Sequence, residues 1–171
     1  SIDLVIFGIK RGYPETKSAY VKLAESLRES FDVRIVEVLN DIGEYTNYRS
    51  NEVSVKQNLE YFFKDSIKVQ KDFRCDETYE YLLNTSKKFP DLFEDQYASV
   101  GNLIQQLLML NEASNHLSSD SALVIRDDIK MNFNFLVRNI RSKGKNIKNN
   151  KVLTSFFNSN RGMSDRWTFS D

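Results

Sequence analysis

The chain has 171 residues, and its 24 Lys and Arg balance its 24 Asp and Glu, so the formal net charge is zero. This balance offers no overall attraction for nucleic acid, and we expect no nucleic-acid partner. With 40% hydrophobic, 12% aromatic and 28% charged residues, the composition is that of a folded globular protein. Because no apolar run approaches the ~20 residues of a membrane helix, we expect one soluble domain over residues 1–171 with no membrane span.

The single cysteine, Cys75, and the single histidine, His116, exclude a disulfide framework and cysteine-rich or histidine-rich metal sites. The sequence opens on a strand-like segment without a charged-then-apolar leader. We therefore expect a cytoplasmic location.

The first 40 residues predict a β-α-β unit. The apolar run Leu-Val-Ile-Phe before Gly8 is typical of a strand buried on both faces, here over residues 3–9. After Pro14, apolar residues recur at helical spacing: Ala19, Tyr20, Leu23, Ala24 and Leu27. Residues 32–39 then alternate as a second strand. Such crossovers join parallel strands and are nearly always right-handed.

The middle of the chain gives a weaker signal. Within residues 44–75, a helix is suggested by Val55, Leu59, Phe62 and Phe63, in what we interpret as an insertion or lid. Residues 76–83 predict a helix, which the Phe-Pro-Asp-Leu-Phe segment at 89–93 breaks.

The clearest helix covers residues 96–117. One arc of its helical wheel holds Val100, Leu103, Ile104, Leu107 and Leu110, and the opposite side holds Asn102, Gln105, Met109 and Glu112. Asn111 and Ser114 fall inside the apolar arc, where each needs a hydrogen bond. They are either satisfied core residues or polar groups that support a site.

The last third of the chain predicts a strand at 121–125, a helix or loop at 133–140 and a strand at 152–157. The basic run from Arg141 to Lys151 is either a solvated loop or a segment that closes over a diphosphate. The whole pattern predicts an α/β fold with a mainly parallel central sheet flanked by helices. Ligands of such sheets bind outside the carboxyl ends of the strands.

Three polar clusters fall at predicted strand ends. Asp127 and Asp128 follow a buried strand, and Mg²⁺ or Mn²⁺ takes one or two such carboxylates together with substrate phosphates. The alternative is a turn in which an aspartate pairs with Arg126.

Residues 8–12 match neither a dinucleotide-binding nor a P-loop motif, which disfavours both classes of protein. There, Lys10 and Arg11 either meet a phosphate at a helix N-terminus or are solvated.

The third cluster is Ser164-Asp165-Arg166, beside Trp167. Asp165 is suited to act as a base on an acceptor hydroxyl or to hydrogen-bond a sugar, with Arg166 orienting it or binding phosphate. The alternative is a surface Asp–Arg pair, which contributes little.

In order and spacing, these motifs resemble the glycosyltransferase-like families of microbial and large-virus surface-polysaccharide synthesis. The resemblance rests on a G-x-x-R turn at residues 8–11, a Gln-rich helix from Gln96, an R-x-D-[IL] box at 126–129 and an [SN]-D-R-aromatic box at 164–167. It spans nearly the whole chain, and it implies a GT-A-like nucleotide-diphosphosugar transferase fold.

The resemblance also implies roles for individual residues. Asp128 would bind the metal, Mn²⁺ or Mg²⁺, with Asp127 as a helper on the cofactor side. The nucleotide or its phosphates would lie near Gly8, Ile9, Lys10 and Arg11. Catalytic roles near the transferred sugar or acceptor would fall to Asp165 and Arg166. Arg126 stands where related enzymes carry the first aspartate of a D-x-D motif, so it would itself offset diphosphate charge.

The function implied is transfer of a sugar from a nucleotide diphosphosugar, expected to be uridine-linked, to a hydroxyl of a glycan acceptor. Residues 1–171 would then be a nucleotide-sugar-binding domain, either complete or the leading domain of a longer protein. Two alternatives remain: another nucleotide-dependent transferase, such as a nucleotidyltransferase, and a non-catalytic α/β interaction domain whose aspartates are caps and turns.

Overall fold

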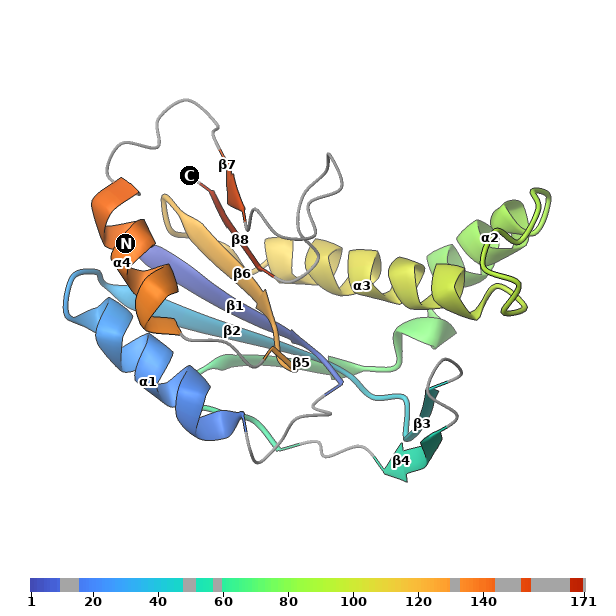
Figure 1. The fold of residues 1–171 in the computed structure, drawn as a ribbon, viewed down its shortest axis with the longest axis horizontal. Helices are drawn as coiled ribbons and strands as arrows, with labels where there is room; N and C mark the ends of the chain where they lie inside the picture. The colour runs from blue at the N-terminus through green and yellow to red at the C-terminus, as the bar shows by residue number, and fades with distance from the viewer. Residues whose placement is uncertain are drawn as a thin grey trace.

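The structure is a computed structural model that describes residues 1–9, 16–47, 52–56, 60–129, 133–143, 152–154 and 167–170. Over these ranges the chain forms a six-stranded sheet, a separate two-stranded hairpin and the helices around them (Figure 1). In chain order the elements are β1 (Ile2–Gly8), α1 (Lys17–Arg28), β2 (Val33–Asn40), β3 (Glu44–Asn47), β4 (Glu52–Lys56), β5 (Ile67–Lys71), the 3-10 helix η1 (Phe73–Cys75), α2 (Glu77–Ser86), α3 (Ala98–Ser114), β6 (Ala122–Arg126), α4 (Phe133–Lys143), β7 (Val152–Thr154) and β8 (Trp167–Ser170).

The strand order of the main sheet is β5-β2-β1-β6-β8-β7. The first four strands in this order are parallel, with Leu4 of β1 opposite Ile35 of β2 and Leu123 of β6. β8 runs antiparallel to both β6 and β7. The α/β prediction with parallel strands is confirmed for these four strands. The antiparallel strand β8 was not predicted.

Helices cover both faces of the sheet, and alternate residues of β1 pack against the helices on opposite faces. Ile2, Leu4 and Ile6 pack in one apolar cluster with α1 and α4. Val5 and Phe7 pack in a second cluster with Met109 and Ala113 of α3 and with Phe73 of η1. β1 is therefore buried on both sides, as its continuous apolar run predicts.

Asp3 is a fully buried charge within β1, and it ties the amino edge of the sheet together. Its carboxylate accepts hydrogen bonds from Arg34 Nε at 2.7 Å and from the backbone amides of Ser118 and Ser119 at 2.8 and 2.9 Å. Burial acts to raise the pKa of Asp3, but these hydrogen bonds outweigh it and lower the pKa to about 2. The loop after α3 is thereby fixed to β1 and β2.

We expect Asp3→Asn to destabilise the fold by about 2 kcal/mol at neutral pH, because the lowered pKa measures how strongly the folded state favours the ionised carboxylate. A lowered pKa stabilises the fold above the unfolded value of 3.8. That contribution is lost as the pH falls toward 2. Urea denaturation across this range should show the gap between wild type and variant closing in acid, whereas Asp120→Asn, at an exposed aspartate, should follow wild type. A gap that does not change with pH would contradict this account of Asp3.

The helix suggested within residues 44–75 is wrong for the described residues. Val55 lies in β4, and Phe62 and Phe63 lie in a loop that precedes β5; Leu59 is outside the described residues. The reason is a buried carboxylate on β2: Glu37 accepts hydrogen bonds from the backbone amides of Phe62 and Phe63 at 2.8 and 3.0 Å. These amides are therefore bonded to a side chain rather than to a helix.

The helix predicted at 96–117 is confirmed as α3, but the prediction of its buried face is wrong except at Ile104. Its buried residues are Gly101, Ile104, Gln105, Met109 and Ala113, while Leu103 and Leu107 are more than half exposed. Asn111 and Ser114 are exposed rather than in the core.

The buried side of α3, which includes Gly101 and Gln105, contacts α2 and β2 through small and polar residues. A Cβ at Gly101 would come within 2.8 Å of the Tyr79 hydroxyl of α2. Gln105 accepts a hydrogen bond at 2.7 Å from the Asn40 amide at the end of β2. The segment at 133–140, predicted as a helix or a loop, is helical in α4. Among the described helices, none has the length and apolar character needed to cross a bilayer.

Candidate functional site

The order of the parallel strands reverses at the carboxyl ends of β1 and β6, and we call this part of the sheet edge the crevice. From β1 the chain passes to β2 on one side, and later returns to place β6 on the other side of β1. In open α/β sheets, ligands bind where the strand order reverses in this way. Gly8 ends β1 and Arg126 ends β6, so two of the three predicted clusters meet here.

Gly8 and Asp127 are in direct contact at the ends of these two strands. Gly8 has a φ of +148°, and a Cβ built on it would lie 2.2 Å from Oδ1 of Asp127. The backbone amide of Asp127 donates to the carbonyl of Phe7 at 2.9 Å, and the residue is buried. Only glycine fits position 8, because both the backbone conformation and the Asp127 carboxylate exclude a side chain.

The turn after β6 is held from α1. The Tyr20 hydroxyl donates to the carbonyl of Arg126 and accepts from the amide of Ile129 at 3.3 Å. The Thr16 hydroxyl donates to the carbonyl of Asp127 at 3.4 Å. Burial, followed by the charge of Asp127, raises the pKa of Tyr20 well above its ordinary value, so this hydroxyl stays protonated as a donor.

Arg126 and Asp128 form an ion pair at the mouth of this turn. An Nη of Arg126 lies 2.8 Å from Oδ2 of Asp128, with side-chain exposures of 23% and 16%. The turn thus presents a cation and a carboxylate that solvent reaches, above the buried carboxylate of Asp127. Both readings of this cluster remain compatible with the pair, since a ligand phosphate or a cation can compete for either partner.

Of the other site residues predicted from the sequence, most lie outside the described residues. Ile9 follows β1 and is partly buried. Lys10, Arg11, Asp165 and Arg166 lie outside the described residues. Trp167, the next residue after Arg166 in the chain, is the first of β8 and pairs with Ile125 near the carboxyl end of β6. The prediction placed the Ser-Asp-Arg box at the end of a strand, whereas the strand described here begins just after it.

The described residues contain no group of three or more His, Cys, Asp or Glu side chains that would form a complete metal cage. Among the residues placed at the crevice, the carboxylate donors are Asp127 and Asp128. This donor set fits Mg²⁺ or Mn²⁺ as they bind with substrate, through one or two carboxylates, water and phosphate oxygens. Asp128 is the better placed of the two, because solvent reaches its side chain.

Two features of this region were not identified from the sequence. Tyr20 was assigned only to the apolar stripe of α1, yet a hydroxyl in such a stripe requires a polar partner, which is a signal that the helix faces a turn. Asn40, at the end of β2, donates to Gln105 and accepts from the amide of Phe73 at 3.1 Å. These contacts fix α3 and η1 at the same edge of the sheet.

We expect Tyr20→Phe to destabilise the protein by roughly 1–3 kcal/mol, because it leaves the Arg126 carbonyl and the Ile129 amide without their shared partner. The ring contacts with Phe62 and Phe133 are retained by phenylalanine. Urea denaturation measures the change. The matched control is Tyr81→Phe at an exposed tyrosine, which should have no effect. Equal stability of the two variants would show that Tyr20 does not hold the turn.

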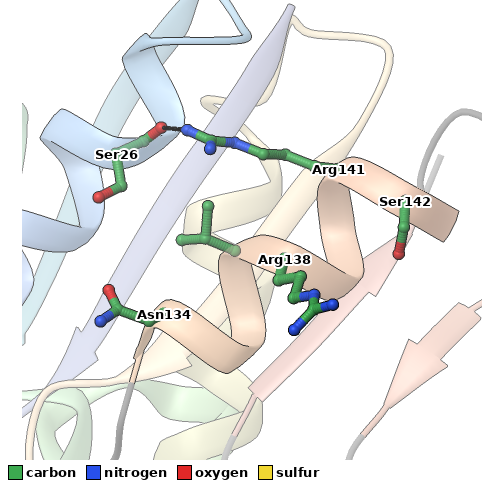
Figure 2. A pocket seen from close by; sticks show the side chains of 6 residues that line it. Ser26, Asn134, Arg138, Arg141 and Ser142 are labelled. Atoms are coloured by element: carbon green, nitrogen blue, oxygen red, sulfur yellow. Dashed lines mark hydrogen bonds between the residues drawn. The ribbon is translucent and has the colours of Figure 1, made fainter.

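A hollow of about 560 Å³ lies between α1 and α4 and is lined by Ser26, Asn134, Val137, Arg138, Arg141 and Ser142 (Figure 2). Arg141 spans the two helices there, donating to the carbonyl of Ser26 and, at 2.8 Å, to the Glu29 carboxylate. Both helices end near this point, and the partial negative charge of helix C-termini disfavours a bound anion. We therefore interpret Arg141 as a structural residue that links the two helices, and we favour the crevice as the functional site.

Comparison of the chain with protein-family models, with curated proteins and with solved structures gave no match. The functional argument therefore rests on the fold and on the crevice between β1 and β6. Together they define an α/β protein with a partly solvent-exposed Arg-Asp-Asp turn at the reversal point of its sheet.

Proposed function

We propose that this protein is a glycosyltransferase that moves a sugar from a nucleotide diphosphosugar, uridine-linked, to a glycan hydroxyl. In this proposal the diphosphate lies over the crevice formed by Gly8, Arg126, Asp127 and Asp128. The resemblance of the motifs names the reaction class, and the crevice supplies a site of suitable chemistry.

The observation that carries the proposal is the contact between Gly8 and Asp127. It brings Gly8 of the G-x-x-R motif and Asp127 of the R-x-D box, 119 positions apart in the sequence, to the same point of the fold. A position without a side chain lets a ligand approach the backbone, and adjacent carboxylates suit a cation that accompanies a diphosphate. Nothing else in the described sheet edge combines these properties with the reversal of strand order.

In this proposal, Arg126 and Asp128 have different roles in binding the diphosphate. Arg126 offsets phosphate charge once a ligand separates it from Asp128, and the freed Asp128 carboxylate holds Mn²⁺ or Mg²⁺. The metal, when bound, would neutralise the departing diphosphate, because negative charge develops on that group during transfer. The buried Asp127 fixes the turn against Gly8. Roles for Ile9, Lys10 and Arg11 at the nucleotide, and for Asp165 and Arg166 at the sugar and acceptor, stay predictions.

Ligand-induced thermal stabilisation tests this proposal, because a ligand that binds only the folded state raises its stability by about 2.7 kcal/mol at one hundred times the dissociation constant. Uridine diphosphate and uridine-linked sugars should raise the melting temperature, and more so with Mn²⁺ than without. Release of uridine diphosphate from a uridine diphosphosugar should accompany this.

Three results would overturn the proposal. Stabilisation by nucleoside triphosphates but not by diphosphosugars would favour a nucleotidyltransferase. Stabilisation by guanosine rather than uridine compounds would contradict the assigned base. No shift with any nucleotide would favour a non-catalytic interaction domain.

A further inference from the structure

The hairpin of α2 and α3 carries most of the large apolar side chains that the described residues leave exposed. Phe89, Leu92 and Phe93, in the loop between the two helices, are 66%, 87% and 59% exposed. Figure 1 shows this hairpin projecting away from the sheet, with the loop at its far end. Side chains of this size in a loop expose an apolar area that soluble proteins ordinarily bury or use for binding.

The hairpin tip lies beyond the carboxyl edge of the sheet. At one end of α3, the carbonyl of His116 accepts from Arg34 at the start of β2. Farther along, Gln105 pairs with Asn40 at the end of β2. The seven residues from Ala98 to Ile104 therefore extend past the sheet, by about 10 Å at 1.5 Å per residue. The tip is on the side of the molecule where the crevice opens.

In this loop, Asp91 and Asp95 are bonded to backbone amides, while Phe89, Leu92 and Phe93 are exposed. Asp91 accepts hydrogen bonds from the amides of Phe93, Asp95 and Tyr97 at 3.0–3.2 Å. Asp95 accepts from the amide of Ser99 at 3.0 Å. Such bonds hold the loop in one conformation and occupy the carboxylates of Asp91 and Asp95, which leaves Glu94 as the exposed acid of the loop.

The backbone that follows Phe93, between the tip and α3, is also unusual. Glu94, Gln96 and Tyr97 have positive φ values of 52°, 57° and 64°. Non-glycine residues in this left-handed region cost about 1–2 kcal/mol each, so the hydrogen bonds of Asp91 hold a conformation that the sequence alone disfavours. Strain of this kind gathers where a segment is shaped for binding. The Tyr97 hydroxyl donates to the carbonyl of Phe89, which ties the two sides of the loop together.

We propose that this tip, residues 87–93, binds the interfacial region of a lipid bilayer. Exposed Lys87 and Lys88 stand next to Phe89 at the end of α2. Lysines beside apolar and aromatic side chains match the boundary between anionic headgroups and acyl chains. A protruding tip suits a flat bilayer, which it can enter without a complementary groove. Membrane binding by the tip is independent of the proposed transfer reaction.

Vesicle flotation of the full chain tests this inference. The wild type should float with phosphatidylcholine vesicles, and more strongly when phosphatidylglycerol is included. The triple substitution of Phe89, Leu92 and Phe93 by serine should weaken binding at least about tenfold, because it removes the apolar area that enters the interface. The double substitution of Lys87 and Lys88 by serine should remove only the added affinity for phosphatidylglycerol.

The matched control is the double substitution of Leu103 and Leu107 by serine. These leucines are 54% and 53% exposed on α3 but lie outside the tip, so their loss should leave flotation unchanged. Far-UV circular dichroism confirms that each variant folds. The inference fails if wild type does not float, or if the control variant loses binding as much as the tip variant. It also fails if the tip substitutions instead abolish self-association detected by light scattering without vesicles, since the occupant would then be a second copy of the chain.

Discussion

Gly8→Ala should destabilise the fold by about 3 kcal/mol or more and abolish binding of uridine diphosphate. A φ of +148° is disfavoured for any residue with a side chain, and the new Cβ would lie 2.2 Å from a carboxylate oxygen of buried Asp127. The Asp127 side chain is buried, so it has little room to move away from the new Cβ. Urea denaturation and calorimetric titration of uridine diphosphate in Mn²⁺ measure the two effects.

Two further variants separate the clash from the backbone effect. Gly43 also has a positive φ, +71°, but no atom lies within 4 Å of its built Cβ, so Gly43→Ala should cost only about 1 kcal/mol and leave ligand binding intact. The double variant Gly8→Ala with Asp127→Ala should be more stable than the two single costs added together, because the second change removes the atoms that the first one meets. Strict additivity would show that Gly8 and Asp127 do not interact as described.

Asp128→Asn should reduce the Mn²⁺-dependent affinity for uridine diphosphate by about a hundredfold while leaving the fold intact. Asparagine keeps an acceptor for Arg126 but removes the negative charge that a hard divalent cation requires. The affinity measured without metal should change little or rise, because a neutral asparagine holds Arg126 less strongly than the aspartate does. Calorimetric titrations with and without Mn²⁺ give the two values.

The matched control for this change is Asp41→Asn. Asp41 follows β2, the next strand at the same edge of the sheet, and accepts a hydrogen bond from Gln70 at 3.1 Å. Its substitution should leave both affinities at their wild-type values. An equal loss in the two variants would indicate a general effect of charge at this edge and would count against Asp128 as the metal ligand.

The sequence predicted the parts of the fold that local patterns determine. The apolar runs of β1 and β6 and the stripe of α1 are regular enough to identify on their own. β5 escaped detection because its sequence, Ile-Lys-Val-Gln-Lys, is short and mostly exposed. The loop at Phe62 and Phe63 was misread because its amides bond to Glu37, a partner far away in the sequence.

The buried side of α3 could not be predicted because several of its largest apolar residues lie on the opposite, exposed face. Leucines at 103 and 107 dominate the helical wheel, yet the sheet is contacted through Gln105 and Met109. Gln105 is buried because Asn40 provides its partner, and that pairing exists only once the strands and helices are assembled. The same limit explains why the contact between Gly8 and Asp127 was invisible, although each had been selected separately as a site residue.

NMR spectroscopy of the ¹⁵N-labelled protein, with Mn²⁺ and uridine diphosphate added together, tests the central claim most directly, since paramagnetic Mn²⁺ broadens the amide signals nearest to it. The account predicts that the signals of Gly8, Asp127, Asp128 and Ile129 are lost first, and that those lining the hollow between α1 and α4 are retained. Broadening centred on Ser26 and Arg138, or no selective broadening at saturating ligand, would contradict a diphosphate site between β1 and β6.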